Sequence, residues 1–389
     1  MRPRPRIWLW VSVLIGCGAR TSLPTDEPTP SPCGMDAPTC LRAAGPCEPA
    51  TVVAATCDGR AWRCPSGTRE HARLSAASTC LPFFEPGGPI RALEGSLVRV
   101  PTADRCLWIG ETVETSAGSL RNVAFEVDPT APYGTCPARA TFRAESVVEL
   151  DGGADPELQV QITGAQRLAG VTRVTYRLFR LDPSAGFGVR ELGTGIGRFD
   201  EARQRIVVSP RPRFAPDLDL GDASFVSDRL YVYGCPPPID FLTEGCVVAR
   251  FDARDDMELF AGGGKWIESA RGRDGAEVFR AGPWISAIAR DGDRLVHLYS
   301  VGFGSTLATH FASAPEGPWT DGPELARCAL PEDDPKAFCA GPVVHEELVD
   351  PTRSEWVVSY GVGTTASDGA ARRAARPEAY WTRLHWIGR

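Results

Sequence analysis

The chain has few helix-forming stretches and no excess of positive charge. No segment keeps apolar residues at i, i+3, i+4 and i+7 over several turns, apart from a turn or two near residues 370–376. Acidic residues outnumber basic ones by 49 to 42, and the net charge of −7 argues against nucleic acid as a partner. The five histidines are scattered and no CxxC pair occurs, so we expect no metal and no cofactor.

Two signatures of common enzymes are also absent. The segment 302–305 (GFGS) lacks the second glycine of the G-x-S-x-G turn that holds a serine nucleophile. The segment 193–197 (GTGIG) departs from the G-x-G-x-x-G loop of dinucleotide-binding folds, and no βαβ pattern surrounds it. The sequence therefore favours neither a serine hydrolase nor a dinucleotide-dependent enzyme.

The N-terminus has the pattern of an export signal. Residues 1–6 contain three arginines, and the apolar run that follows ends at Ile15. This run is about half the length of roughly 20 residues that a membrane-spanning helix needs. It leads into Leu14-Ile-Gly-Cys17, which resembles the bacterial lipobox. We expect a lipoprotein signal peptide at 1–16 and a lipid on Cys17, with a plain secretory signal as the alternative.

Such a lipid implies an exported protein that is anchored to the bacterial outer membrane or the cell surface. Acyl chains can hold a domain at a bilayer without any spanning helix, so we expect membrane contact through the N-terminal lipid only. Nothing in the sequence predicts an oligomer, and we expect a monomer.

The chain contains 13 cysteines, and lipidation of Cys17 leaves an even set of twelve. Because an exported protein meets an oxidising compartment, we expect all twelve to form disulfides. Six of them crowd into a segment with few large apolar side chains, where 15 pairings are open. Spacing favours local pairs among the rest. The crowded six are Cys33, Cys40, Cys47, Cys57, Cys64 and Cys80, and the local pairs are Cys106 with Cys136, Cys235 with Cys246 and Cys328 with Cys339.

The rest of the chain is expected to be all-β. Short runs of strand-forming residues alternate with turn signals from residue 93 onward, and their number suits a five-bladed β-propeller. A β-sandwich is the alternative. The predicted organisation is a signal peptide at 1–16, a lipidated cysteine and tether at 17–32, a disulfide-rich module at 33–80, a linker at 81–92 and the propeller at 93–389.

Four segments resemble, in order, the bacterial exported domains classified as domain of unknown function 4185, which are relatives of five-bladed glycosidase propellers. The resemblance implies a five-bladed propeller and a role connected with sugars. The sequence departs from the pattern at Glu111, where the family has Asp, and at Glu346, where it has Pro. The segments are 106–112 (CLWIGET), 228–251 with its two strands, 295–319 ending in Gly-Pro-Trp, and 345–348 (HEEL).

The resemblance also implies candidate catalytic residues. Hydrolysis of a glycosidic bond needs two carboxyl groups. The matching positions are Glu111 and Glu347, with His345 as an orienting neighbour, and Asp219 and Asp222 form a second acidic cluster from which we add Asp222. The structural alternatives are a turn carboxylate for Glu111, a hydrogen-bonded pair for His345 and Glu347, and a solvated turn for the two aspartates.

Together these features predict a surface-anchored bacterial lipoprotein whose propeller binds or hydrolyses a polysaccharide. A catalytically inactive relative that only binds sugar is included in this expectation. The alternative is a non-enzymatic interaction scaffold that holds a component of the cell envelope. Several tryptophans could stack on sugar rings, although the cores of propeller blades use the same residue. They are Trp108, Trp266, Trp284, Trp319 and Trp356.

Overall fold

The computed structural model describes most of the chain after residue 32. The predicted signal peptide, Cys17 and the tether lie outside the described residues, and every absence reported below refers to the described ones. These are residues 33, 37–38, 40–43, 47–48, 50–59, 61–66, 69–70, 79–127, 136–137, 140–185, 188–215, 218–235, 244–269, 271–281, 285–349 and 354–388.

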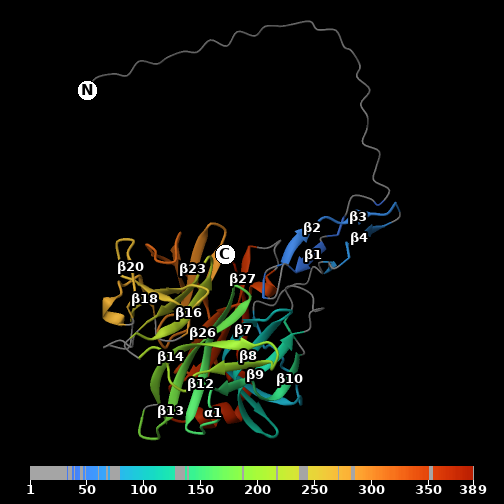
Figure 1. The fold of residues 1–389 in the computed structure, drawn as a ribbon. Helices are drawn as coiled ribbons and strands as arrows, with labels where there is room; N and C mark the ends of the chain where they lie inside the picture. The colour runs from blue at the N-terminus through green and yellow to red at the C-terminus, as the bar shows by residue number, and fades with distance from the viewer. Residues whose placement is uncertain are drawn as a thin grey trace, which may run out of the picture.

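Five sheets surround a central axis (Figure 1). Each sheet starts with an inner strand. The inner strand of each sheet contacts the inner strands of the two sheets beside it, and these contacts close the ring. This arrangement is a five-bladed β-propeller, which confirms the predicted fold and excludes the sandwich. The inner strands are β7 (Ile90–Pro101), β12 (Leu158–Leu168), β16 (Leu220–Val226), β22 (Ala287–Asp291) and β26 (Ala337–Val344).

The other strands of each blade follow outward, mainly as antiparallel hairpins. Blade 1 adds β8 (Cys106–Thr115), β9 (Gly118–Val127) and β10 (Ala140–Ser146), and blade 2 adds β13 (Val171–Leu181), β14 (Val189–Asp200), β15 (Arg205–Val208) and β11 (Val148–Leu150). Blade 3 adds β17 (Leu230–Gly234), β18 (Glu244–Phe251), β19 (Met257–Phe260), β20 (Trp266–Ile267) and β21 (Phe279–Ala281). Blade 4 adds β23 (Arg294–Ser300), β24 (Thr306–Ala312) and β25 (Thr320–Arg327), and blade 5 adds β27 (Glu355–Thr364) and β28 (Arg383–Gly388).

An N-terminal strand completes the last blade. β6 (Thr79–Cys80) pairs with β28, with Leu384 opposite Cys80 and His385 opposite Thr79. Strands from opposite ends of the described chain therefore lie side by side in one sheet. The predicted domain boundaries stay a prediction, and this pairing adds a strand from before residue 81 to a propeller sheet.

The segment before β6 forms small sheets of its own. One contains β1 (Cys40–Ala43), β2 (Ala50–Val53) and β5 (Arg69–Glu70), and another contains β3 (Thr56–Cys57) and β4 (Trp62–Arg63). Few of their side chains are buried. Disulfides supply the constraint that a large core supplies elsewhere.

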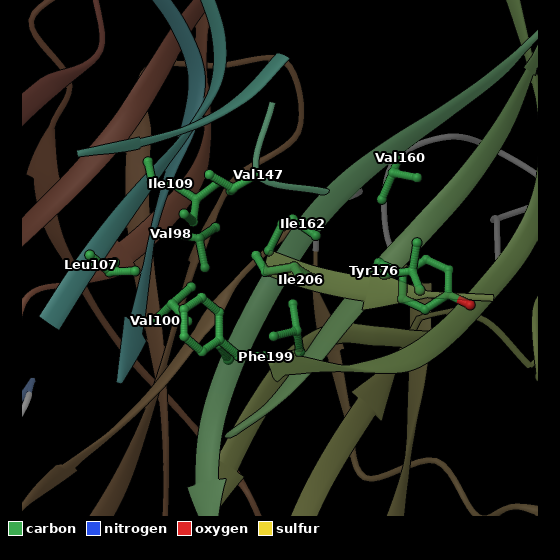
Figure 2. Packing of buried hydrophobic residues seen from close by; sticks show 14 of the residues in the cluster. Val98, Val100, Leu107, Ile109, Val147, Val160, Ile162, Tyr176, Phe199 and Ile206 are labelled. Carbon is green, nitrogen blue, oxygen red and sulfur yellow. The ribbon is translucent and has the colours of Figure 1, made fainter. Parts of the chain in front are cut away.

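Apolar side chains fill the space between neighbouring blades. Figure 2 shows Val98 and Val100 of β7 on one side, and Ile162 of β12 and Phe199 of β14 on the other. The inner strand β26 buries side chains on both faces, and its sequence AFCAGPVV is accordingly almost free of polar residues. Fully burying each such side chain contributes about 1.5–3 kcal/mol.

Helix is rare, as the sequence predicts. The described α-helix is α1 (Gly369–Ala375), which lies between β27 and β28 at the place where a turn or two was expected. Within the described ranges, no helix has the length and apolar character needed to cross a membrane.

All twelve cysteines after Cys17 form disulfides, and this is typical of an exported protein. The predicted local pairs Cys235–Cys246 and Cys328–Cys339 are confirmed. The predicted pair Cys106–Cys136 is wrong. Because the chain brings two cysteines of the crowded segment against blade 1, the bonds there are Cys47–Cys106 and Cys80–Cys136. The other two bonds are Cys33–Cys57 and Cys40–Cys64.

We expect removal of the Cys235–Cys246 bond to lower the free energy of unfolding by about 3 kcal/mol, since the chain-entropy model gives this value for a short loop. The double variant Cys235→Ser/Cys246→Ser would be measured by chemical denaturation. The matched control is Cys328→Ser/Cys339→Ser, because both bonds span 11 residues. The chain-entropy model predicts that both variants lose the same free energy of unfolding. Losses that differ by more than about 2 kcal/mol would contradict it.

Candidate functional site

A cavity of about 440 Å³ lies at the end of the ring where the inner strands begin. It draws side chains from blades 1, 2 and 5, from the start of blade 4 and from α1. Ionisable, amide and aromatic groups meet in it. They include Glu94, Glu111, Glu191, Arg121, Arg177, Arg373, Gln159, Gln161, Phe179 and Phe338.

Glu111 of β8 lines this cavity, as the predicted site requires. Its Oε2 accepts hydrogen bonds from the backbone N–H of Ser96 at 3.1 Å and from Ser96 Oγ at 3.2 Å. The register of β7 shifts between Glu94 and Leu97, which brings this backbone towards Glu111. Gly95 has a φ of +82°, and a Cβ there would lie 2.4 Å from Glu111 Oε2. Any side chain at position 95 would therefore collide with the carboxylate of Glu111, and glycine avoids this collision.

Glu94 is a second carboxyl group beside Glu111, and the sequence analysis missed it. It lies on inner strand β7, with Arg373 Nε of α1 3.5 Å from its Oε2. Burial raises the pKa of Glu94, Arg373 opposes the shift, and the nearby charges of Glu114 and Glu111 raise the pKa further. The cavity thus contains two interacting carboxyl groups, one of which has a raised pKa.

The floor of the cavity is a buried ion-pair cluster around Arg177. Its Nη2 donates to Asp219 Oδ2 at 2.9 Å and also to Asp222 Oδ1, and its Nη1 lies 3.6 Å from Glu191 Oε2. The backbone N–H of Cys235 donates to the second oxygen of Asp222 at 2.8 Å. Burial is the main cause that raises the pKa of both aspartates, against the opposing charge of Arg177.

This cluster changes the interpretation of the two aspartates. Asp219 and Asp222 are buried, so the alternative of a solvated turn is wrong for both. Arg177 and Glu191 line the cavity, whereas Asp222 lies behind them. Among the described residues, Arg177 Nε is buried without a hydrogen-bond partner, whereas the carboxyl group of Glu191 makes a side-chain hydrogen bond with Asp219. The carboxyl groups of Glu191 and Asp219 therefore pair with each other beneath the cavity.

His345 and Glu347 do not line the cavity. They follow the end of β26, whereas the cavity lies at its beginning. His345 is fully buried, with Nδ1 3.0 Å from Glu347 Oε1, Nε2 2.8 Å from Ser359 Oγ, and its ring against Trp108. Burial alone would raise the pKa of Glu347, but His345 and Arg99 hold it below its ordinary value.

A proton donor would need the opposite shift of the Glu347 pKa, so these contacts favour the structural alternative for both residues. Arg99 shows which parts of the structure His345 and Glu347 help to hold together. Its guanidinium lies 3.1 Å from Glu346 Oε2 and donates to the carbonyl oxygen of Cys47 at 2.7 Å. This cluster therefore connects the last blade to the disulfide-rich segment.

The tryptophans that were candidates for sugar stacking do not line the cavity. Trp108 and Trp356 are buried in the core, and Trp266 and Trp319 pack against aromatic neighbours of blade 3. Trp284 lies outside the described residues. The aromatic rings at the cavity are Phe179 and Phe338, which sequence reasoning did not select.

Comparison with known proteins adds support for the fold. No protein-family model matches the chain, and no curated protein matches it. A solved structure of a candidate hydrolase from Bacteroides ovatus ATCC 8483 matches with a TM-score of 0.54 and 15% identity, over 76% of this chain and 87% of that chain. The shared fold is the propeller. At this identity the similarity supports the architecture alone.

Further structures match at TM-scores below 0.5, two glycosidases among them, and no argument rests on these matches. One is a thermostable family-43 glycoside hydrolase, with a TM-score of 0.44 and 13% identity over 81% of this chain and 91% of that chain. The other is an exo-β-1,3-galactanase from Phanerochaete chrysosporium, with a TM-score of 0.46 and 12% identity over 79% of this chain and 64% of that chain. The resemblance to domain of unknown function 4185 stays a prediction.

Proposed function

We propose that the propeller binds a polysaccharide in the 440 Å³ cavity and hydrolyses a glycosidic bond there. The observation that carries the proposal is the pair Glu94 and Glu111, which are close enough for the charge of one to raise the pKa of the other. Glycosidases use one carboxyl group that is held protonated and one that is ionised. A cavity at the axis of the ring is also the expected place for a ligand.

The cavity floor suits a polyhydroxylated ligand. The guanidinium of Arg177, the carboxyl group of Glu191 and the amides of Gln159 and Gln161 line it. A sugar hydroxyl both donates and accepts hydrogen bonds, so it can pair with amide and charged groups of this kind. The faces of Phe179 and Phe338 can pack against the C–H groups of a sugar ring.

In the proposed reaction, Glu94 donates its proton to the leaving oxygen while the bond from the anomeric carbon to that oxygen breaks. Glu111 is the second carboxyl group of the reaction. Either it takes a proton from the water that attacks the anomeric carbon, or it attacks that carbon itself and forms a glycosyl ester, which a water molecule then hydrolyses while Glu94 takes the proton of that water. The anomer of the released sugar distinguishes these two roles of Glu111. Arg373 offsets part of the negative charge that remains on Glu94.

A polysaccharide panel that includes arabinans, galactans and xylans tests the proposal. New reducing ends report hydrolysis, and retention of the protein on the insoluble polymer reports binding. We expect both for at least one polymer, with exposed Glu85→Gln as a control variant that leaves both unchanged. Retention without release would reduce the function to binding. If the protein is retained on no polymer and releases reducing ends from none, the proposal is overturned. The interaction scaffold at the cell envelope is then the remaining function.

We also propose that the protein is exported and anchored by a lipid on Cys17, in the outer membrane or at the cell surface. The short apolar run before Leu14-Ile-Gly-Cys17 and the six disulfides support this location. We expect a monomer that has no nucleic-acid partner and touches the membrane through this lipid only.

When a host that makes lipoproteins expresses the full chain, we expect the protein in the detergent phase after phase partitioning. Cys17→Ser should move it to the aqueous phase, because the thioether that carries the acyl chains cannot form. The control is Ser22→Ala, a substitution just after the predicted cleavage site that leaves Cys17 in place. Equal partitioning of wild type and Cys17→Ser would contradict the anchor.

A further inference from the structure

Phe303 lies beside the cavity but is not part of its lining. It is in the loop between β23 and β24 and is 40% exposed. Its ring stands edge-on to that of Phe338, at 5.1 Å between centroids and an interplanar angle of 90°. Phe338 is 8% exposed and lines the cavity. Phe303 therefore extends the apolar wall of the cavity towards solvent.

The loop that carries Phe303 is held in place by both half-cystines of one disulfide. The backbone N–H of Cys339 donates to the carbonyl oxygen of Gly304 at 3.0 Å, and that of Cys328 donates to Ser305 at 2.7 Å. Because Cys328 and Cys339 are bonded to each other, the two contacts restrain the loop together. Phe338 directly precedes Cys339, so the same disulfide fixes both rings.

The chemistry of this loop favours a neutral ligand with an apolar face. Residues 300–306 (SVGFGST) contain no charged side chain, and Val301 is 45% exposed next to Phe303. Glycines on both sides leave the Phe303 ring without bulky neighbours along the chain, and Gly302 has a φ of +55° that suits a tight turn. The C–H face of a sugar ring fits such an aromatic surface.

We propose that Phe303 is a binding platform for a sugar unit that lies outside the cavity and is linked to the unit bound inside it. The ligand is then a chain of at least two sugar units, and affinity depends on chain length. This inference rests on the proposed function, because it assigns the outer part of the same ligand. The argument for one sugar chain is the continuity from the cavity through Phe338 to Phe303.

The test compares affinities for a monosaccharide and its trisaccharide by calorimetry. The probes are arabinose with arabinotriose, galactose with β-1,3-galactotriose, and xylose with xylotriose. We expect Phe303→Ala to weaken trisaccharide binding about fivefold to tenfold, as the loss of one ring contact predicts, and to leave monosaccharide binding unchanged. Phe303→Trp should keep the trisaccharide affinity, because a flat ring remains.

The matched control is Phe84→Ala. Phe84 is 37% exposed and stands edge-on to Trp381 at 5.2 Å, so its environment is similar, but it does not border the cavity. We expect this variant to bind both sugars like the wild type. Equal loss for both sugars, or no loss for either, in Phe303→Ala would overturn the platform while the proposed function stands. A wild type that binds none of the probes and none of the polymers would overturn both.

Discussion

Turnover is expected to fall by about 10²–10⁴ when Glu94 is replaced by Gln, since an amide cannot protonate the leaving oxygen. Glu111→Gln should cause a loss of similar size, because the ionised partner is removed. Retention on the polymer should survive both changes, since the remaining lining of the cavity is unaltered. The measurement is the rate of reducing-end release at saturating polymer, beside the retention assay.

The pH profile provides a stricter test of Glu94. Because Glu94 must be protonated to act as the acid, turnover should decline as the pH rises through its raised pKa. Glu114 contributes to that raised pKa through its charge. The variant Glu114→Gln should therefore move the alkaline limb of the profile to lower pH. An alkaline limb that persists unchanged in both Glu94→Gln and Glu114→Gln would assign the proton donor to another group.

The free energy of unfolding is expected to fall by about 3–5 kcal/mol in Arg177→Met, because this change leaves two buried carboxylates without their cation. Asp219 and Asp222 share the guanidinium, and all three side chains are almost completely buried. The measurement is urea denaturation at neutral pH. Arg180→Met is the control, since Arg180 lies on the same strand but is exposed.

The triple variant Arg177→Met/Asp219→Asn/Asp222→Asn separates charge from packing. If uncompensated charge causes the loss, removing both carboxylates should recover more than half of it. If Arg177→Met lowers the free energy of unfolding by less than about 1 kcal/mol, the cluster contributes no more to stability than a surface ion pair does.

The sequence predicts the propeller well because its evidence is local. Strand-forming runs, turn residues and the scarcity of helical periodicity each depend on a few neighbouring residues. The same holds for the Cys235–Cys246 and Cys328–Cys339 bonds, which close short loops. The strand pairing of β6 with β28 joins residues about 300 positions apart, and no local signal reports such a pairing.

The candidate site is only partly predictable for the same reason. Glu111 was found through its motif, and Asp222 through the acidity of its segment. Glu94 carries a weak signal, as a single acidic residue within an apolar inner strand before a glycine, and Glu191 carries none. His345 and Glu347 match a motif, but their distance from the cavity depends on the direction of β26, which a motif does not encode.

The seam where β6 completes the last blade has a mechanical consequence. The Cys80–Cys136 bond joins the strand of the last blade to the segment that leads into the outer strand of the first, so the ring is closed covalently there as well as by backbone hydrogen bonds. A force that pulls on the chain from the N-terminal side meets Cys33 and Cys40, which are bonded within the small sheets, and then Cys47, which is bonded to Cys106 of β8. The Cys47–Cys106 bond therefore passes the load into blade 1 before it reaches the two-residue pairing of β6 with β28.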